Sequence, residues 1–331
     1  MRIEDVHVAL ASGGPRADLV GLAVAADRLG YGALWLTELA SRDAFGLLTE
    51  IALKTERIRL GTGIVNPFSR TPAVLAMSAA TLAELSGRHV NLGLGASSRK
   101  VVEDLHGVPF QRPAGRIEET LEVVRLALSG RPIEYSKGAV QLRDFKLEVP
   151  GLEVRLWAAG FSPRLLEVAG RLADGWLPIH PSKRGIGRQL AAVRAAADRV
   201  GRPMPEVAAY IYTYVGTEPD EGLELNRRTV AWYIASGGEG YRNLFRRYGY
   251  EAEVARVTEL WAAGRRNEAR AVVDAAMLED LSISARPEVV GERLEEFAAI
   301  GIDHPTLRFP DGIAAERQAA MLESVARALD R

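Results

Sequence analysis

Short apolar runs alternate with amphipathic stretches along most of the chain. Eight runs predict strands, at Ile3–Leu10, Ala33–Leu36, Ile58–Val65, Val90–Leu94, Val154–Ala158, Gly175–Ile179, Val207–Val215 and Pro305–Phe309. The stretches between them predict helices, at Asp18–Leu29, Ala44–Thr55, Pro72–Leu85, Arg116–Ser129, Pro163–Leu172, Gly185–Val200 and Ala314–Leu329. This alternation predicts an α/β protein with a (β/α)8 TIM barrel, and an open doubly wound sheet is the alternative.

Two segments interrupt the alternation within an expected single domain, residues 1–331. Residues 131–150 contain a run from Ile133 to Val149 in which apolar residues alternate around Lys137-Gly138, and this pattern predicts a β-hairpin. Residues 219–281 are rich in Arg, Glu and Ala and predict a helical insertion after the seventh strand. Because barrel enzymes bind substrates at the carboxyl ends of the strands, this insertion would cover a substrate. A subunit interface or a simple cap over the core is the alternative.

Composition excludes several classes of protein. The net charge of -1 gives no basic surface for nucleic acid or an anionic membrane. The absence of cysteine excludes disulfides, thiolate metal sites and cysteine nucleophiles. No apolar run approaches the roughly 20 residues of a spanning helix, and the first residues do not resemble a signal peptide. We therefore expect a cytoplasmic protein with a small-molecule substrate and no nucleic-acid or membrane partner.

The predicted carboxyl ends of the strands carry mostly glycine, alanine and small hydroxyl residues. They lack a glycosidase-type carboxylate pair, a Ser-His-Asp set and a lysine placed for a Schiff base. No two of the five histidines have metal-ligand spacing, so no metal site is expected. A site with so few acids and bases is typical of a bound organic cofactor that carries the reaction itself.

Glycines mark where the chain must approach another group closely. Gly63 and Gly95 follow consecutive strands, whose ends should open onto the same face of the sheet. The run Gly93–Ser98 lacks the third glycine of a dinucleotide fingerprint, so we reject a Rossmann interpretation. In Ala159–Pro163, a glycine and a capping serine precede a helix whose free N–H groups favour a phosphate. An ordinary capped helix is the alternative there.

Two side chains are candidate catalytic residues. Glu38 ends the second strand, where it could bond a polar edge of a cofactor, cap a helix or pair with Arg42 or Arg70. His106 lies in the loop after the fourth strand and could donate a proton, although loop histidines are more often structural.

Several motifs together resemble one known family. They are Trp35–Glu38, Leu60–Ser97, His106–Phe110, Ala158–Gly160 and Ala173–Pro178. With them the chain resembles the luciferase-like superfamily, in its branch of oxidoreductases that use coenzyme F420, which includes methylenetetrahydromethanopterin reductase. The similarity is weaker beyond residue 180, and residues 219–281 match no motif of the family.

The resemblance implies F420 as cofactor and hydride transfer between this deazaflavin and a small organic substrate. It also implies a cis peptide bond at Gly63–Ile64 behind the ring, and we expect a homodimer. The cofactor-binding residues that it implies are Thr37, Glu38, Thr62, Gly63, Ile64, Gly95, Ala96, Ser97, Ala159, Gly160, Phe161 and Ser162. Two alternatives remain: a luciferase-like monooxygenase that uses FMN and oxygen, and a barrel without catalytic activity.

Overall fold

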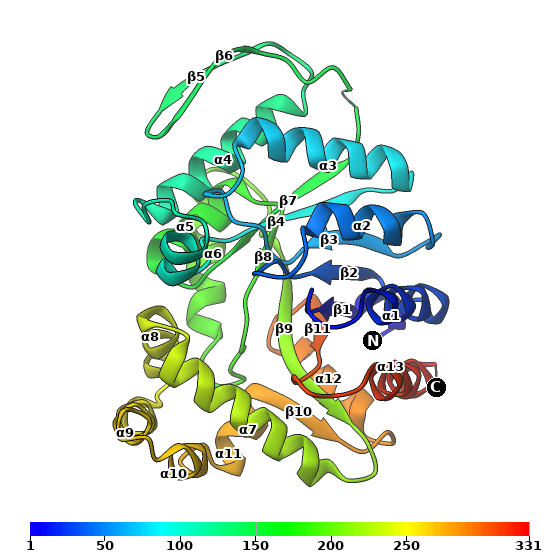
Figure 1. Cartoon of the computed structure of the whole chain (residues 1–331), viewed down its shortest axis with the longest axis vertical. Helices are drawn as coiled ribbons and strands as arrows, with labels where there is room; N and C mark the ends of the chain where they lie inside the picture. The colour runs from blue at the N-terminus through cyan, green and yellow to red at the C-terminus, as the bar shows by residue number, and fades with distance from the viewer. Residues whose placement is uncertain (150, 331) are drawn as a thin grey trace.

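Eight parallel strands form a closed barrel in the computed structural model, which describes residues 1–149 and 151–330 (Figure 1). Their order is β1, β2, β3, β4, β7, β8, β9 and β11, and β11 pairs with β1 to close the barrel. The bounds are β1 (His7–Leu10), β2 (Ala33–Leu36), β3 (Arg59–Thr62), β4 (Val90–Leu94), β7 (Val154–Ala159), β8 (Gly175–Leu177), β9 (Glu206–Val215) and β11 (His304–Arg308). The predicted barrel is confirmed, and the open sheet is wrong.

The helices between the strands cover the outside of the barrel. They are α1 (Arg16–Leu29), α2 (Ala44–Ala52), α3 (Pro72–Ser86), α4 (Pro113–Ala127), α5 (Pro163–Leu172), α6 (Gly187–Asp198), α12 (Val290–Ala299) and α13 (Ala315–Leu329). All seven predicted helices are present. The start of α4 was placed too late, because Pro113 takes its first position, where a missing N–H costs nothing.

Three expected strands are shorter than their apolar runs, and one of them, β8, ends at Leu177 instead of Ile179. The first begins at His7 because Ile3–Asp5 forms a turn of 3-10 helix (η1), in which the Asp5 carboxylate accepts the N–H of Arg2 at 2.8 Å. The third ends at Thr62, and beyond it Val65 forms only an isolated bridge with Leu94. One strand was not predicted, β10 (Ser282–Ala285), which pairs with the end of β9 beyond the barrel.

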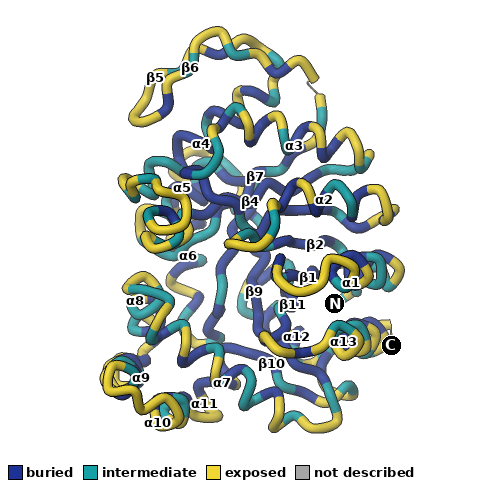
Figure 2. The backbone as a smooth tube through the Cα atoms, in the orientation of Figure 1, coloured by how far each residue is buried: buried dark blue, intermediate teal, exposed yellow. Residues whose placement is uncertain are grey.

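Aromatic side chains fill the inside of the barrel. Trp35 of β2 and Trp157 of β7 are buried there, with ring centroids 5.0 Å apart, and Tyr210 of β9 packs in the same cluster. A larger apolar cluster lies between the strands and the surrounding helices. Figure 2 shows the strands as the most buried part of the chain. The barrel is therefore a packed core, and a ligand can bind only above it.

Both insertions are present as predicted. The hairpin of β5 (Ile133–Lys137) and β6 (Val140–Phe145) packs on α4 at the outside of the barrel, at the top of Figure 1. The second insertion consists of α7 (Pro219–Ser236), α8 (Glu239–Arg247), α9 (Glu251–Ala262), α10 (Arg266–Ala271) and α11 (Ala275–Leu281). These five helices bury an apolar cluster of their own.

A buried carboxylate holds the second insertion over the end of β8. Asp280 of α11 accepts hydrogen bonds from the Ser182 hydroxyl at 2.6 Å, the Tyr250 hydroxyl at 2.8 Å and the Arg184 N–H at 2.9 Å. Ser182 and Arg184 lie in the loop that follows β8. The insertion is therefore fixed beside the carboxyl ends of the strands. Within the described residues, no helix has the length and apolar character needed to cross a membrane.

Candidate active site

The base of the site is the backbone that follows β3. The Gly63–Ile64 peptide bond is cis, as the resemblance implied. The Tyr210 hydroxyl donates to the Gly63 carbonyl at 3.3 Å, and a Cβ atom on residue 63 would lie 1.7 Å from that hydroxyl oxygen. Ile64, Ala159 and Ile179 pack on the barrel interior from above. Gly63 is thus required where β3 faces β9.

The ends of β3 and β4 are tied together by a buried hydroxyl. The Thr62 hydroxyl donates to the Gly93 carbonyl and accepts the Gly93 N–H, each at 2.9 Å. Thr62 is fully buried, and its contact with a cofactor stays a prediction. Beyond it, a Cβ on Gly95 would lie 2.7 Å from Ile64, while Ala96 is half-buried and Ser97 is exposed in the left-handed region with φ +59°. The chain that follows β4 therefore consists of small residues, Gly95, Ala96 and Ser97.

Glu38 is held in place by two kinds of partner. Arg70 donates to its two carboxylate oxygens at 2.5 and 2.8 Å, and the N–H of Ala44 at the start of α2 donates at 2.8 Å. Glu38 therefore accepts a hydrogen bond from the start of helix α2 and also forms an ion pair with Arg70. These are the two structural alternatives to a cofactor contact. Arg42 instead donates to the Ser12 carbonyl. Thr37, before Glu38, accepts the Ser12 N–H at 3.3 Å. This fixed carboxylate suits an orienting role better than proton transfer.

The side chain of His106 forms no hydrogen bond with these described residues. It is exposed at the end of η2 (Val101–Leu105), a turn of π-helix. Among the described residues, none forms a hydrogen bond or a ring contact with its side chain. The structure thus does not bring His106 together with Glu38, and its catalytic role stays a prediction.

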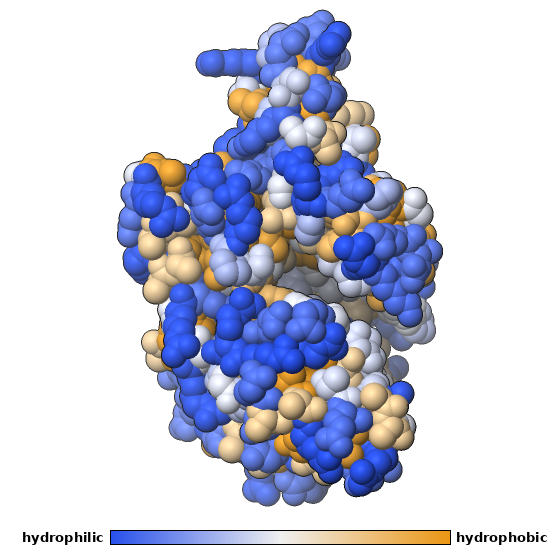
Figure 3. Space-filling view, turned by 90° about the vertical axis from the view of Figure 1, so that its left-hand side faces the viewer, coloured by the Kyte–Doolittle hydropathy of each residue, from blue (hydrophilic) through white to orange (hydrophobic). Residues whose placement is uncertain are grey.

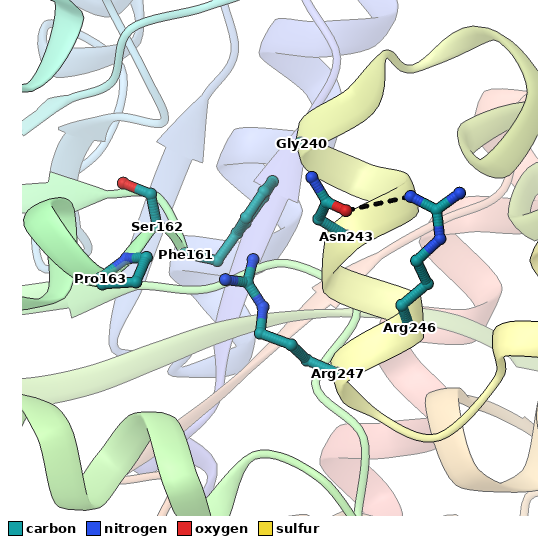
Figure 4. A pocket seen from close by; sticks show the side chains of 7 residues that line it. All are labelled: Phe161, Ser162, Pro163, Gly240, Asn243, Arg246 and Arg247. Atoms are coloured by element: carbon teal, nitrogen blue, oxygen red, sulfur yellow. Dashed lines mark hydrogen bonds between the residues drawn. The ribbon is translucent and has the colours of Figure 1, made fainter.

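A pocket of about 470 Å³ lies between the start of α5 and helix α8 (Figure 4). Its lining residues are Phe161, Ser162, Pro163, Gly240, Asn243, Arg246 and Arg247. Ser162 caps α5, its hydroxyl accepting the N–H of Leu165 at 3.3 Å, and the Trp176 ring donates to the Gly160 carbonyl at 2.9 Å. The predicted helix N-terminus is therefore capped and opens into a pocket.

Two arginines make this pocket basic. Arg246 already pairs with Glu239 at 2.7 Å and Glu251 at 3.3 Å. Arg247 is exposed, has no ion-pair partner within the described part of the chain, and points toward Phe161 and Pro163 in Figure 4. A helix N-terminus and an unpaired guanidinium together favour an anion, typically a phosphate. Neither arginine was among the predicted site residues, because nothing in the sequence indicates that the insertion faces the start of α5.

A second polar cluster was also missed, at the ends of β8, β9 and β11. His180 follows β8, is fully buried with φ +51°, and neither ring nitrogen has a partner in the described residues. Its ring stacks on Tyr212 of β9 at 5.0 Å, and burial lowers the pKa of His180 to about 3. The Tyr212 hydroxyl lies 3.1 Å from that of Tyr233 of α7. The sequence feature that could have indicated this cluster is His180, a histidine at the predicted end of a strand.

The candidate cofactor-binding residues lie at the ends of four neighbouring strands, β2, β3, β4 and β7. Gly63 and Gly95 leave room there for Tyr210 and Ile64, and the basic pocket lies at the end of β7. Figure 3 faces the side that carries α5 and α8, and shows a hollow across its middle. No group of three or more His, Asp or Glu within residues 1–149 and 151–330 could hold a metal ion.

The chain is similar to one family model and to several sequences named as reductases. The family model described as luciferase-like monooxygenase matches residues 4–304. The 5,10-methylenetetrahydromethanopterin reductase of Archaeoglobus fulgidus is 26% identical over 296 residues, which cover 87% of this chain and 88% of the relative. A phthiodiolone/phenolphthiodiolone dimycocerosates ketoreductase of Mycobacterium bovis is 30% identical, with 80% of this chain and 71% of the relative covered. Both relatives are named as reductases, and the matched regions cover most of this chain and most of each relative.

Solved structures share the fold. The coenzyme F420-dependent tetrahydromethanopterin reductase of Methanopyrus kandleri superposes with a TM-score of 0.85 at 23% identity, and 98% of each chain is covered. The oxygenating constituent of 3,6-diketocamphane monooxygenase from Pseudomonas putida, in complex with FMN, gives 0.72 at 17% identity, with 99% of this chain and 98% of the other covered. At these identities the structural likeness supports the fold alone.

Proposed function

Because the chain belongs to the luciferase-like monooxygenase family, we propose that it is an oxidoreductase that uses coenzyme F420. It would transfer a hydride between the deazaflavin and a small organic substrate. The observation that carries this proposal is the capped start of α5 beside an unpaired Arg247, which suits the phosphate of F420. Relatives named as reductases, and one named as a putative coenzyme F420-dependent oxidoreductase, support it.

The residues of this chain would bind and orient the cofactor rather than share its chemistry. F420, when bound, supplies a hydride carrier. The Gly63–Ile64 backbone would lie behind the ring, and Gly95, Ala96 and Ser97 along its side. Ala159, Gly160 and Phe161 would lead to the phosphate at Ser162. Glu38, fixed by Arg70, would orient a polar edge.

A cofactor titration tests the proposal. We expect oxidised F420 to bind at least tenfold more tightly than FMN, measured by the change in visible absorbance of each. The reverse order, together with oxygen consumption by the reduced complex, would instead favour the FMN-dependent monooxygenase. Binding of neither cofactor would favour a barrel without catalytic activity.

Replacing Arg247 tests the phosphate pocket separately. We expect Arg247→Gln to weaken F420 binding about tenfold, or ~1.4 kcal/mol, because a charge-assisted hydrogen bond to phosphate is lost. Binding of the F420 fragment that lacks the phosphate should not change. Arg256→Gln, which removes an exposed arginine paired with Glu259 on α9, is the matched control. Equal losses for F420 and its fragment would argue against a phosphate at this pocket.

We also infer a homodimer. Apolar side chains lie exposed on one helix, with Val74, Met77 and Leu85 of α3 each more than two-fifths exposed. Such a row on a surface helix supports a protein partner, and a second copy of the chain is the one we propose.

A further inference from the structure

The polar cluster at the ends of β8, β9 and β11 stands across the barrel from β3. Tyr212 of β9 is in register with Arg308 of β11. Tyr210, two residues before Tyr212, reaches the carbonyl of Gly63 with its hydroxyl. Two residues of a parallel strand rise about 6.6 Å. Arg308 and Tyr212 therefore lie one layer above the base of the site, on the side not assigned to the cofactor.

Arg308 carries a positive charge, and several N–H groups of its guanidinium have no hydrogen-bond partner in the described residues. Its side chain is 15% exposed and lies 5.8 Å from the centroid of the Tyr212 ring. It donates to the Phe309 carbonyl at 3.2 Å and meets Asp311 only at 3.4 Å, and Asp311 is 92% exposed. Such an exposed ion pair contributes little, and a guanidinium has five donors. An incoming carboxylate could therefore replace Asp311.

Two phenols lie beside this cation. The hydroxyls of Tyr212 and Tyr233 are 3.1 Å apart, so one donates to the other and a further donor remains. Burial raises the pKa of both, so that they stay neutral hydrogen-bond donors. His180 stacks on the Tyr212 ring, with the two centroids 5.0 Å apart. The cluster thus combines neutral hydrogen-bond donors with closely packed aromatic rings.

A row of rings connects the cluster to the basic pocket. The Phe161 ring, which lines the pocket, lies 5.2 Å from Tyr241, and Tyr241 lies 4.7 Å from Tyr233. The site therefore has two separate cationic ends, Arg247 at the pocket and Arg308 at the cluster.

On the basis of the proposed function, we propose that Arg308, Tyr212 and Tyr233 bind the substrate and select one that carries a carboxylate. The planar guanidinium of Arg308 matches a carboxylate in geometry, and a phenol hydroxyl completes its hydrogen bonds. The aromatic faces beside it favour a planar substrate. His180 is a positioning residue for Tyr212. Arg247 serves the phosphate of the cofactor, so each anion has its own arginine.

The test compares two probes of nearly the same size and shape, the anion benzoate and the neutral amide benzamide. Calorimetry on the full chain, with and without F420, should show benzoate binding at least tenfold more tightly than benzamide. Arg308→Gln should abolish this preference, and Arg308→Lys, which keeps the charge but not the fork, should retain part of it. Arg247→Gln should leave the preference unchanged.

Three results would overturn the inference: equal affinities for the two probes in the unmodified protein, no detectable benzoate binding, or a preference that survives Arg308→Gln but disappears in Arg247→Gln. The arm without F420 separates this inference from the proposed function. A failure to bind F420 would overturn the cofactor proposal and still leave the benzoate preference measurable. If Arg308→Gln does not fold, Arg308→Lys decides.

Discussion

Gly63→Ala should destabilise the protein by about 2–3 kcal/mol and weaken F420 binding more than tenfold, because it overpacks a closed core beside the site. A Cβ on residue 63 would lie 1.7 Å from the Tyr210 hydroxyl oxygen and 3.0 Å from Cβ of Trp35. Neither neighbour can move freely, since Tyr210 and Trp35 are both buried in the barrel interior. The backbone behind the cofactor would therefore shift.

Denaturant unfolding and F420 titration of the variant measure these two effects. Tyr210→Phe removes the atom in closest conflict, so the double variant should recover much of the lost stability. Gly21→Ala is the control, because its Cβ would meet nothing within 4 Å in the middle of α1. It should be neutral or stabilising by up to about 1 kcal/mol. A Gly63→Ala protein as stable as the unmodified one would contradict the proposed packing.

His180 should make the fold sensitive to mild acid. Burial lowers its pKa from the ordinary 6.5 to about 3, so the unfolded chain binds a proton below pH 6.5 that the folded chain does not. The stability that this neutral ring provides is complete above pH 6.5 and is lost as the pH falls toward 3. Between pH 7 and pH 5 the loss should be about 2 kcal/mol.

The comparison that isolates this effect is His180→Phe, which keeps a ring among Tyr212, Tyr233 and Phe245 but cannot titrate. Unfolding free energies at pH 7, 6 and 5 should fall less steeply for the variant. His7, whose pKa burial also lowers, is present in both proteins and cancels in the difference. Parallel pH profiles would show that His180 does not carry the acid sensitivity.

Local patterns predicted most of the architecture. Pro72 and Gly87 mark the ends of α3, and the apolar run at Ala33–Leu36 is a buried barrel strand. The insertion predicted at 219–281 matches α7 through α11. These features depend on periodicity and turn chemistry within a few residues, which a single sequence displays. The strand β10 was missed because it continues directly from α11 and is only four residues long.

From the sequence alone, the backbone features of the candidate site could be predicted, but its charged side chains could not. Gly63, Gly95 and Ser162 could be proposed as site residues because glycines and caps at strand ends have a local signature. Arg247 and Arg308 could not, since an arginine in a helix or at a strand end looks the same whether it faces solvent or a ligand. Packing of distant segments decides which of these it does.

Hydrophobic periodicity and turn residues along the chain are enough to predict a barrel with two insertions. The tertiary structure is needed to show that Glu38 pairs with Arg70, that Arg247 faces the start of α5, and that His180 is buried against Tyr212. Periodicity is encoded within each element, whereas charge pairing and burial depend on elements far apart in the chain.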